Sequence, residues 1–117
     1  MRLWHESLIP RLPTQQLCGQ HRECAALRGR GWGRRHSVVD YVFNYPASML
    51  YRYHMLVIDE MERRGYSVDP LWRFPRYRGK RCEPWDDMGY EARAYPEHNA
   101  QYLDECIENL RSKGVDI

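Results

Sequence analysis

The stretch LYRYHMLVIDEMERRG, residues 50–65, predicts the longest helix of the chain. Its apolar side chains recur every three or four residues, which places them on one face of an α-helix. Pro46 suits the first turn, where its missing N–H costs no hydrogen bond, and Gly65 is typical of the residue after a helix end. The face consists of Leu50, Tyr53, His54, Val57, Ile58 and Met61. We therefore expect His54 to be a hydrogen-bonded core residue.

Two further helices are expected, one on each side of this one. Thr14 is a suitable N-cap for a first helix, and Gly29 is suited to lie just past its end. Pro96 is expected to open a last helix, and Gly114 to mark its end. The apolar stripe of that last helix is Ala100, Leu103, Ile107 and Leu110.

The remaining segments show no convincing strand alternation. Residues 1–13 are interpreted as an irregular arm packed on the core, residues 29–36 as a glycine-rich loop, and residues 37–44 as a short element. Residues 66–95, rich in Pro, Gly and aromatic side chains, predict a long packed loop with one short helix. The predicted fold class is all-α: a single compact domain over residues 1–117, with about three amphipathic helices and long connecting loops.

The net charge of +2 is unevenly distributed along the chain. Residues 1–39 hold seven basic and two acidic side chains, which gives +5, whereas residues 40–117 hold eleven basic and fourteen acidic ones, which gives −3. Sixteen of the 18 basic residues are Arg, whose planar guanidinium matches the geometry of phosphate. A basic N-terminal third indicates nucleic acid as a partner.

The sequence also argues against several classes of protein. No apolar run approaches the roughly 18 residues of a membrane span, and there is no signal-peptide pattern, so a cytoplasmic protein without a membrane partner is expected. No Cys/His cluster has zinc spacing, so we expect no metal and no cofactor. The four cysteines are interpreted as reduced thiols: Cys18, Cys24, Cys82 and Cys106.

Two segments concentrate basic side chains. The segment 28–36 (RGRGWGRRH) contains no acid, and the segment 72–81 (WRFPRYRGKR) interleaves basic with aromatic side chains. Basic side chains neutralise phosphates, and interleaved aromatic rings can stack on exposed bases. We predict that both segments contact nucleic acid; the alternative is a solvated charged surface over core aromatics. The predicted contacts are Arg28, Arg30, Arg34 and Arg35 in the first segment, beside His36, and Arg78, Lys80 and Arg81 in the second.

Four stretches of the sequence, taken in order, carry a resemblance to a known family. The first stretch, residues 12–23 (LPTQQLCGQHRE), ends in an Arg-Glu pair. The second, residues 53–68 (YHMLVIDEMERRGYSV), is a predicted long helix that ends in Arg, Gly and an aromatic residue. A Tyr-Arg-Gly triplet (residues 77–79) and a closing helix (residues 96–113) follow. In this order they resemble the pyrimidine-dimer DNA glycosylase family.

This resemblance implies an activity. The protein would be a metal-independent DNA glycosylase and AP lyase that acts on damaged double-stranded DNA, carrying pyrimidine dimers or abasic sites. In the family, a terminal amine attacks the sugar C1′ of the damaged nucleotide, the base is released and a Schiff base forms. Elimination then cuts the strand on the 3′ side.

The resemblance also implies site residues. The nucleophile would be the amine of Met1, because the bulky Arg2 normally blocks removal of an initiator Met; family members commonly begin with Thr. Glu23 would stabilise the cationic imine, while Arg2 and Arg22 would hold the flanking phosphates. His21, next to Arg22, is also expected to face the DNA.

Two other classes of function remain open. A binding module of the same fold would recognise distorted DNA without catalysis, with a steep fall of affinity in salt and no covalent intermediate. A helical protein with an RNA or protein partner is the third possibility. The sequence does not determine the lesion, and a monomer is expected.

Overall fold

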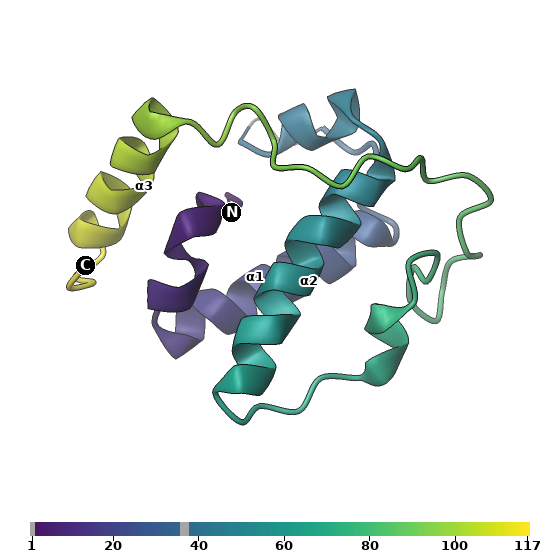
Figure 1. Cartoon of the computed structure of the whole chain (residues 1–117), viewed down its shortest axis with the longest axis horizontal. Helices are drawn as coiled ribbons and strands as arrows, with labels where there is room; N and C mark the ends of the chain where they lie inside the picture. Colours follow the sequence, from purple (N-terminus) through teal and green to yellow (C-terminus); the bar gives the residue numbers. More distant parts are fainter. Residues whose placement is uncertain (1, 36–37) are drawn as a thin grey trace.

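Helices make up all of the regular structure in the described residues, 2–35 and 38–117, of the computed structural model (Figure 1). The α-helices are α1 (Thr14–Arg28), α2 (Ala47–Arg63) and α3 (Ala100–Ser112). Three short 3₁₀ helices accompany them: η1 (Glu6–Arg11), η2 (Asp40–Asn44) and η3 (Pro70–Arg73). The predicted all-α fold class with three main helices and long connections is confirmed, and residues 36 and 37 lie outside the described part.

Helix α2 forms where its apolar periodicity predicts it. All six residues of the predicted face, from Leu50 to Met61, are buried, and α2 packs against α1. The helix begins directly after Pro46, whose carbonyl accepts a hydrogen bond from the Met49 amide at 3.0 Å. Gly65 follows the helix with a φ of 92°, the left-handed conformation that favours glycine, so the chain turns away there.

The ends of α1 differ in detail from the prediction. The N-cap is Pro13, whose carbonyl accepts from Leu17 at 2.9 Å, and Thr14 is the first helical residue; its hydroxyl bonds instead to Tyr66. Gly29 does follow the last turn as expected, but its φ is −88°. Glycine is favoured here by space, because a Cβ would lie 3.0 Å from the carbonyl oxygen of Arg78.

Helix α3 starts later than predicted. It begins at Ala100, and Asn99 caps it by accepting a hydrogen bond from the Tyr102 amide at 2.9 Å. Pro96 does not open the helix, since Glu97 and His98 are held in the preceding loop by tyrosine hydroxyls of the η2 region. An N-cap side chain satisfies one of the free amides of the first turn, which fixes the start at Ala100.

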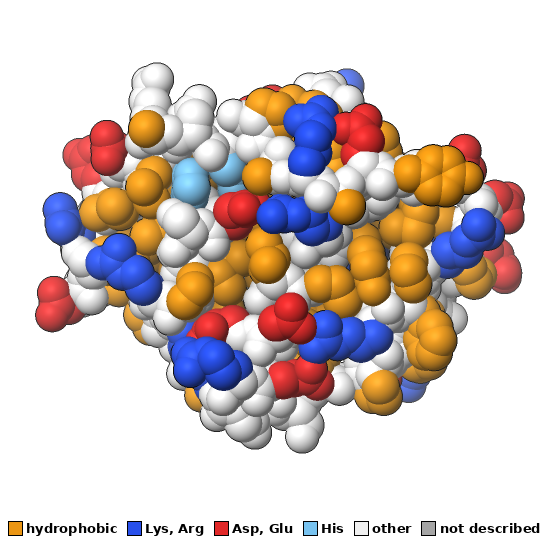
Figure 2. All heavy atoms as spheres, in the orientation of Figure 1, with side chains coloured by type: hydrophobic (Ala, Val, Ile, Leu, Met, Phe, Trp, Pro, Cys, Tyr) orange, Lys and Arg blue, Asp and Glu red, His pale blue; other side chains and the backbone are white. Residues whose placement is uncertain are grey.

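The face of the molecule that α2 presents carries charges of both signs. Arg73, at the end of η3, forms ion pairs with Asp59 and Glu62 of α2, and Arg52 pairs with Glu6. Figure 2 shows blue and red side chains interspersed with hydrophobic ones on this side. This face is therefore not the basic surface that the sequence predicts.

Candidate active site and nucleic-acid interface

The N-terminal segment, residues 2–5, lies between the α-helices (Figure 1). Gln20 of α1 holds two of its backbone atoms: its Nε2 donates to the carbonyl of Arg2 at 2.9 Å, and its Oε1 accepts from the amide of Trp4 at 3.1 Å. Tyr53 of α2 donates its hydroxyl to the carbonyl of Trp4 at 2.7 Å. Gln20 and Tyr53 are buried, so water does not compete for these bonds.

Helix α3 holds the same segment from another side. The hydroxyl of Tyr102 donates to the carbonyl of Leu3 at 2.5 Å, and the amide of His5 lies 3.4 Å from Sγ of Cys106. Leu3 is fully buried. Side chains from all three α-helices therefore fix the backbone just after the chain start.

Glu23 lies on the same helix as Gln20, the residue that bonds to the N-terminal segment. η1 and α1 run in roughly opposite directions (Figure 1), because the chain reverses at Pro13. Gln20 bonds to both Arg2 and Trp4, and it lies just before the C-terminal half of α1. Glu23 lies in that half, about one turn beyond Gln20. Met1 itself lies outside the described residues.

The side chains of Glu23 and Arg22 both lack a partner in the described residues. Glu23 is half-buried and Arg22 exposed, and neither makes a hydrogen bond or ion pair within residues 2–35 and 38–117. A surface carboxylate that pairs with a neighbouring Arg would contribute little to the stability of the fold. That local pair is not formed, and the Glu23 carboxylate remains available.

A cavity of about 360 Å³ adjoins the N-terminal segment. Its lining is Trp4, Gln15, Gln16, Gly19, Arg22 and Lys113. The guanidinium of Arg2 lies 5.8 Å from the centre of the Trp4 ring and Lys113 Nζ lies 5.4 Å from it, both in cation–π positions. Positive charge without an acidic lining residue suits this cavity to a phosphate-bearing ligand.

Arg28 requires a correction. It is fully buried, and its guanidinium donates to the carbonyls of Trp72 (2.9 Å), Phe74 (2.9 Å) and Tyr77 (2.7 Å). Burial lowers the pKa of Arg28 to about 10, which leaves it charged at neutral pH. Arg28 therefore has no exposed donor to offer DNA; it holds the 72–77 loop against the end of α1.

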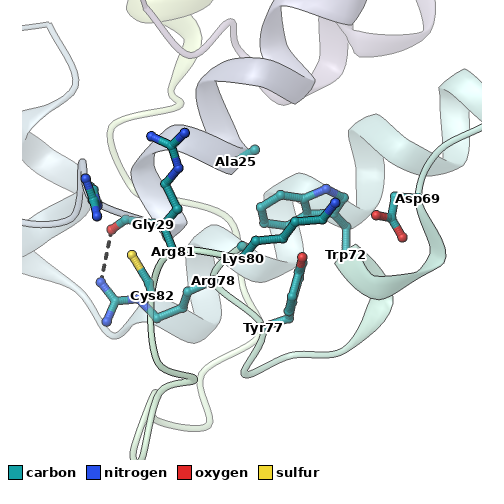
Figure 3. A pocket seen from close by; sticks show the side chains of 11 residues that line it. Ala25, Gly29, Asp69, Trp72, Tyr77, Arg78, Lys80, Arg81 and Cys82 are labelled. Carbon is teal, nitrogen blue, oxygen red and sulfur yellow. Dashed lines mark hydrogen bonds between the residues drawn. The ribbon is translucent and has the colours of Figure 1, made fainter.

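Arg78 is also largely committed to the protein. Its Nε donates to the carbonyl of Arg28 at 2.7 Å. Its Nη2 donates to the carbonyl of Gly29 at 3.0 Å (Figure 3). The guanidinium lies over the ring of Trp85, 5.0 Å from its centre. These bonds satisfy carbonyls at the C-terminus of α1, and they leave Nη1 and the second hydrogen of Nη2 for an outside partner.

The other predicted contacts are open to solvent. The side chains of these exposed cations make no hydrogen bond or ion pair within the described part of the chain: Arg30, Arg34, Arg35, Lys80 and Arg81. Arg30, Lys80 and Arg81 line a second cavity, of about 420 Å³, together with Trp72 and Tyr77. In Figure 3, Lys80 extends along the Trp72 indole toward the side where Asp69 lies, and Arg81 points away from it. This cavity combines cations with aromatic rings, as the sequence predicts.

Helix α1 contributes to both cavities. Gly19 and Arg22 line the first, whereas Ala25 and Gly29 line the second. The two cavities, which contain predicted site residues from different parts of the sequence, therefore both adjoin α1. Arg34 and Arg35 line neither cavity.

His21 and His54 form a pair between α1 and α2. His54 is fully buried, as expected, and its Nε2 lies 2.8 Å from Nδ1 of His21. Burial and the nearby charge of Arg28 lower the pKa of His54 to about 2. Burial, followed by the charges of Arg22 and Arg28, also lowers the pKa of His21. His21 is half-buried and keeps one ring edge free.

Residues 2–35 and 38–117 contain neither a candidate metal site nor a helix that could span a membrane. Those residues contain no cluster of three or more His, Cys, Asp or Glu side chains that could hold a metal ion. None of the described helices is long and apolar enough to cross a bilayer. The four cysteines are free; Cys24 and Cys106 are buried, and burial raises the pKa of Cys24.

Sequence reasoning missed the residues that hold the N-terminal segment. Gln20 lies on the buried face of α1, and a polar side chain at such a position was the one available signal. Tyr53 and Tyr102 fit an apolar helix face, so their hydroxyl bonds gave no signal. Lys113 lies beyond α3, and its proximity to Trp4 depends on the tertiary fold.

No curated protein and no solved structure matches the chain. A family model described as pyrimidine dimer DNA glycosylase matches residues 1–74, which is more than half of the 117 residues. The match includes the N-terminal segment, α1 and α2, hence Gln20, Arg22 and Glu23. The chain belongs to the pyrimidine dimer DNA glycosylase family, and its function is in general that of a DNA-repair glycosylase.

Proposed function

We propose that the protein is a DNA glycosylase and AP lyase for damaged double-stranded DNA, with the amine of Met1 as nucleophile. The amine nitrogen attacks C1′ of the damaged nucleotide, and the base leaves with the electrons of the glycosidic bond and takes up a proton. Loss of one amine proton and opening of the sugar ring give a protonated imine between Met1 and C1′. Removal of a proton from C2′ then expels the 3′ phosphate and cuts the strand.

The observation that carries this proposal is the anchoring of the N-terminal segment. Three α-helices bond to the backbone of residues 2–5, and one of the bonding residues, Gln20, lies about one turn before Glu23 on α1. A terminus with no role is usually mobile, because nothing compensates the entropy lost on ordering it. Buried side-chain bonds to residues next to the amine support a nucleophile whose position is fixed.

A terminal amine suits this reaction at neutral pH. Its unperturbed pKa is about 7.7–8.0, against about 10.4 for a Lys side chain, so a sizeable fraction is unprotonated and nucleophilic. The described part of the chain holds only two Lys side chains, and both are exposed to solvent. The amine of Met1 is therefore the better nucleophile.

Glu23 is assigned the electrostatic and proton-transfer role. Its carboxylate is half-buried and unpaired in the described residues, and it is about one turn of α1 beyond Gln20. A carboxylate near the imine stabilises its positive charge and accepts the C2′ proton.

DNA is proposed to lie along α1 and both cavities. Arg2 and Arg22 would hold phosphates next to the damaged nucleotide, where Lys113 adds a further cation. The exposed cations of the second cavity would hold the backbone farther along the duplex, with Arg34 and Arg35 beside them. Arg78 would contribute through the guanidinium hydrogens that its two carbonyl bonds leave free. Chemistry at C1′ in a duplex requires a nucleotide to be flipped out of the stack.

Borohydride trapping tests the proposal. Untagged protein is mixed with duplexes that carry an abasic site, a pyrimidine dimer or no lesion, and the imine is reduced to a stable amine. We expect an adduct with both damaged duplexes, mapped to the Met1 amine and lost when that amine is acetylated. The adduct with the dimer duplex requires glycosylase activity, because the base must leave first.

Glu23→Gln separates catalysis from binding in the same assay. It is expected to abolish strand cutting with little change in affinity, since the amide keeps the shape and loses the charge. Unchanged cutting would refute the role of Glu23. Absence of any adduct from folded, DNA-binding protein would refute the lyase and leave a DNA-binding module of the same fold.

A further inference from the structure

A chain of hydrogen bonds runs from the buried end of α1 to its surface. The Nη1 of Arg28 lies 3.0 Å from Nδ1 of His54, and the Nε2 of His54 lies 2.8 Å from Nδ1 of His21. Arg28 and His54 are fully buried, whereas His21 is half-buried. The chain therefore connects a buried charge to a ring at the protein surface.

The first member fixes the polarity of the chain. A guanidinium donates hydrogen bonds and accepts none, so Nδ1 of His54 must be the acceptor. His54 is then neutral with its proton on Nε2, which donates to Nδ1 of His21. His21 in turn keeps its proton on Nε2.

Arg28 cannot reverse this polarity. All four of its Nη hydrogens have acceptors: the carbonyls of Trp72, Phe74 and Tyr77, and the ring of His54. These three carbonyls belong to one loop that closes over the guanidinium, so the group has no room to turn.

The surface end of the chain has a vacant donor. Nε2 of His21 makes no hydrogen bond within the described residues. His21 packs edge-on against Trp72, with ring centres 6.2 Å apart, and Ala25 lies one helical turn farther along α1. Trp72 and Ala25 both line the cavity that contains Lys80 and Arg81. His21 is therefore a neighbour of the cavity lining, although it does not itself line the cavity.

We propose that Arg28 and His54 are positioning residues that hold His21 as a neutral Nε2–H donor to a phosphate oxygen of bound DNA. The site of contact rests on the proposed function, whereas the tautomer does not. The charged and titratable groups around His21 are Arg22 and Arg28 on α1, His54 on α2 and, beyond His54, Arg73 at the end of η3. Each of these cations opposes a positive charge on His21.

A neutral contact has a distinctive salt dependence. Each phosphate neutralised by a cation adds about 0.9 to the slope of log affinity against log salt, whereas a neutral N–H adds affinity without adding slope. His21 is thus expected to differ from its neighbour Arg22 in slope, although both touch phosphate.

Nitrogen-15 NMR of the histidine rings tests the tautomer directly in the full chain. We expect His21 to carry its proton on Nε2 and to titrate below its ordinary pKa of about 6.5. His54→Gln preserves the polarity, because the amide oxygen accepts from Arg28 and the amide nitrogen donates to His21. His54→Leu removes the donor, and His21 should then titrate closer to its ordinary pKa of about 6.5. A wild-type His21 that titrates near 6.5, or that carries its proton on Nδ1, would overturn the proposal.

The contact is tested with a duplex that contains a tetrahydrofuran abasic-site analogue. His21→Ala should weaken binding about tenfold with an unchanged salt slope, whereas Arg22→Ala should lower the slope by about 0.9. An equal loss of slope in both variants would refute the neutral donor.

The two arms separate this inference from the proposed function. If the tautomer is as expected and wild-type protein forms no adduct and binds no DNA, the proposed function fails and so does the contact, while the hydrogen-bond chain stands. If adduct formation is normal and His21→Ala binds like wild type, the contact alone is refuted.

Discussion

The hydroxyl of Tyr53, in the middle of α2, lies 2.7 Å from the carbonyl oxygen of Trp4. The same hydroxyl lies 2.7 Å from Oε1 of Gln20, so one buried proton is shared between α1 and the N-terminal segment. Burial raises the pKa of Tyr53 well above its ordinary value, which keeps this donor protonated. The position of the N-terminal segment therefore depends on the packing of α2 on α1.

Tyr53→Phe should impair the trapping reaction more than the fold. The change leaves a buried carbonyl without its donor, at a cost of about 1–2 kcal/mol of unfolding free energy. We expect the borohydride adduct to form about tenfold more slowly, because the amine loses part of its positioning. Single-turnover trapping and urea unfolding measure the two effects. Tyr66→Phe is the control, since Tyr66 bonds to Thr14 at the surface; equal adduct rates for both variants would contradict the prediction.

Arg28→Met should be among the most destabilising substitutions of a basic residue. It leaves three loop carbonyls without their donor, and we expect a loss of about 3 kcal/mol or more. Urea unfolding at pH 7 provides the measurement. Arg30→Met is the matched control two residues away; Arg30 is exposed and unpaired in the described residues, so its change should stay within about 0.5 kcal/mol. Similar losses for both would show that the Arg28 bonds contribute little.

Lys80→Ala and Arg81→Ala should change the salt dependence of DNA binding. Both side chains are exposed at the second cavity, and each should lower the slope of log affinity against log salt by about 0.9. Arg63→Ala is the control, because Arg63 lies on the α2 side in an ion pair with Glu60. Fluorescence anisotropy with one duplex at several salt concentrations gives the slopes. If the Arg63 variant lost as much slope, the second cavity would not be the DNA interface.

His98 should make the fold acid-sensitive. Its Nδ1 accepts from the amide of Glu6 at 3.2 Å, and burial, followed by the charge of His5, lowers its pKa to about 4. Between pH 6.5 and 4 the unfolded chain therefore binds a proton that the folded chain does not, so stability falls as the pH falls through this window. One such group contributes about 1.4 kcal/mol per pH unit.

His98→Gln should reduce that slope. We expect the unfolding free energy of the variant to fall less steeply between pH 6.5 and 5, because Gln does not titrate. The difference in slope should be about 1.4 kcal/mol per pH unit, the contribution of one titrating group. His54 contributes in the same direction and stays in both proteins. Parallel pH profiles for wild type and variant would exclude His98 as a source of the acid sensitivity.

The parts of the fold that could be predicted rest on local patterns. α2 has an apolar face at helical spacing, and that face is what packs on α1, so the sequence pattern and the tertiary contact coincide. The start of α3 was predicted too early, because Pro96 is a good local signal. Bonds from Tyr45 to Glu97 and from Tyr41 to His98 favour a loop instead, and they join residues more than 50 positions apart.

The candidate site was predictable to a similar degree. The resemblance located Arg22 and Glu23 on the first helix, and the family match to residues 1–74 confirms that family. The burial of Arg28 could not be predicted from the basic residues around it in the sequence, because the loop that covers it lies about 45 positions later in the chain. The roles of Met1 and Glu23 remain predictions that trapping will test.

Arg28 and Arg78 each donate hydrogen bonds to backbone carbonyls in the other's segment, at the end of α1. Arg28 holds carbonyls of the loop that carries Tyr77, and Arg78, which follows it, holds the carbonyls of Arg28 and Gly29. Tyr102 likewise supports Leu3 from the far end of the chain. Residues beyond position 74 thus complete a site whose proposed chemistry lies in the first 23. A chimera that joined residues 1–74 to another relative's C-terminal part would preserve this geometry only if the graft supplied both the guanidinium and the hydroxyl.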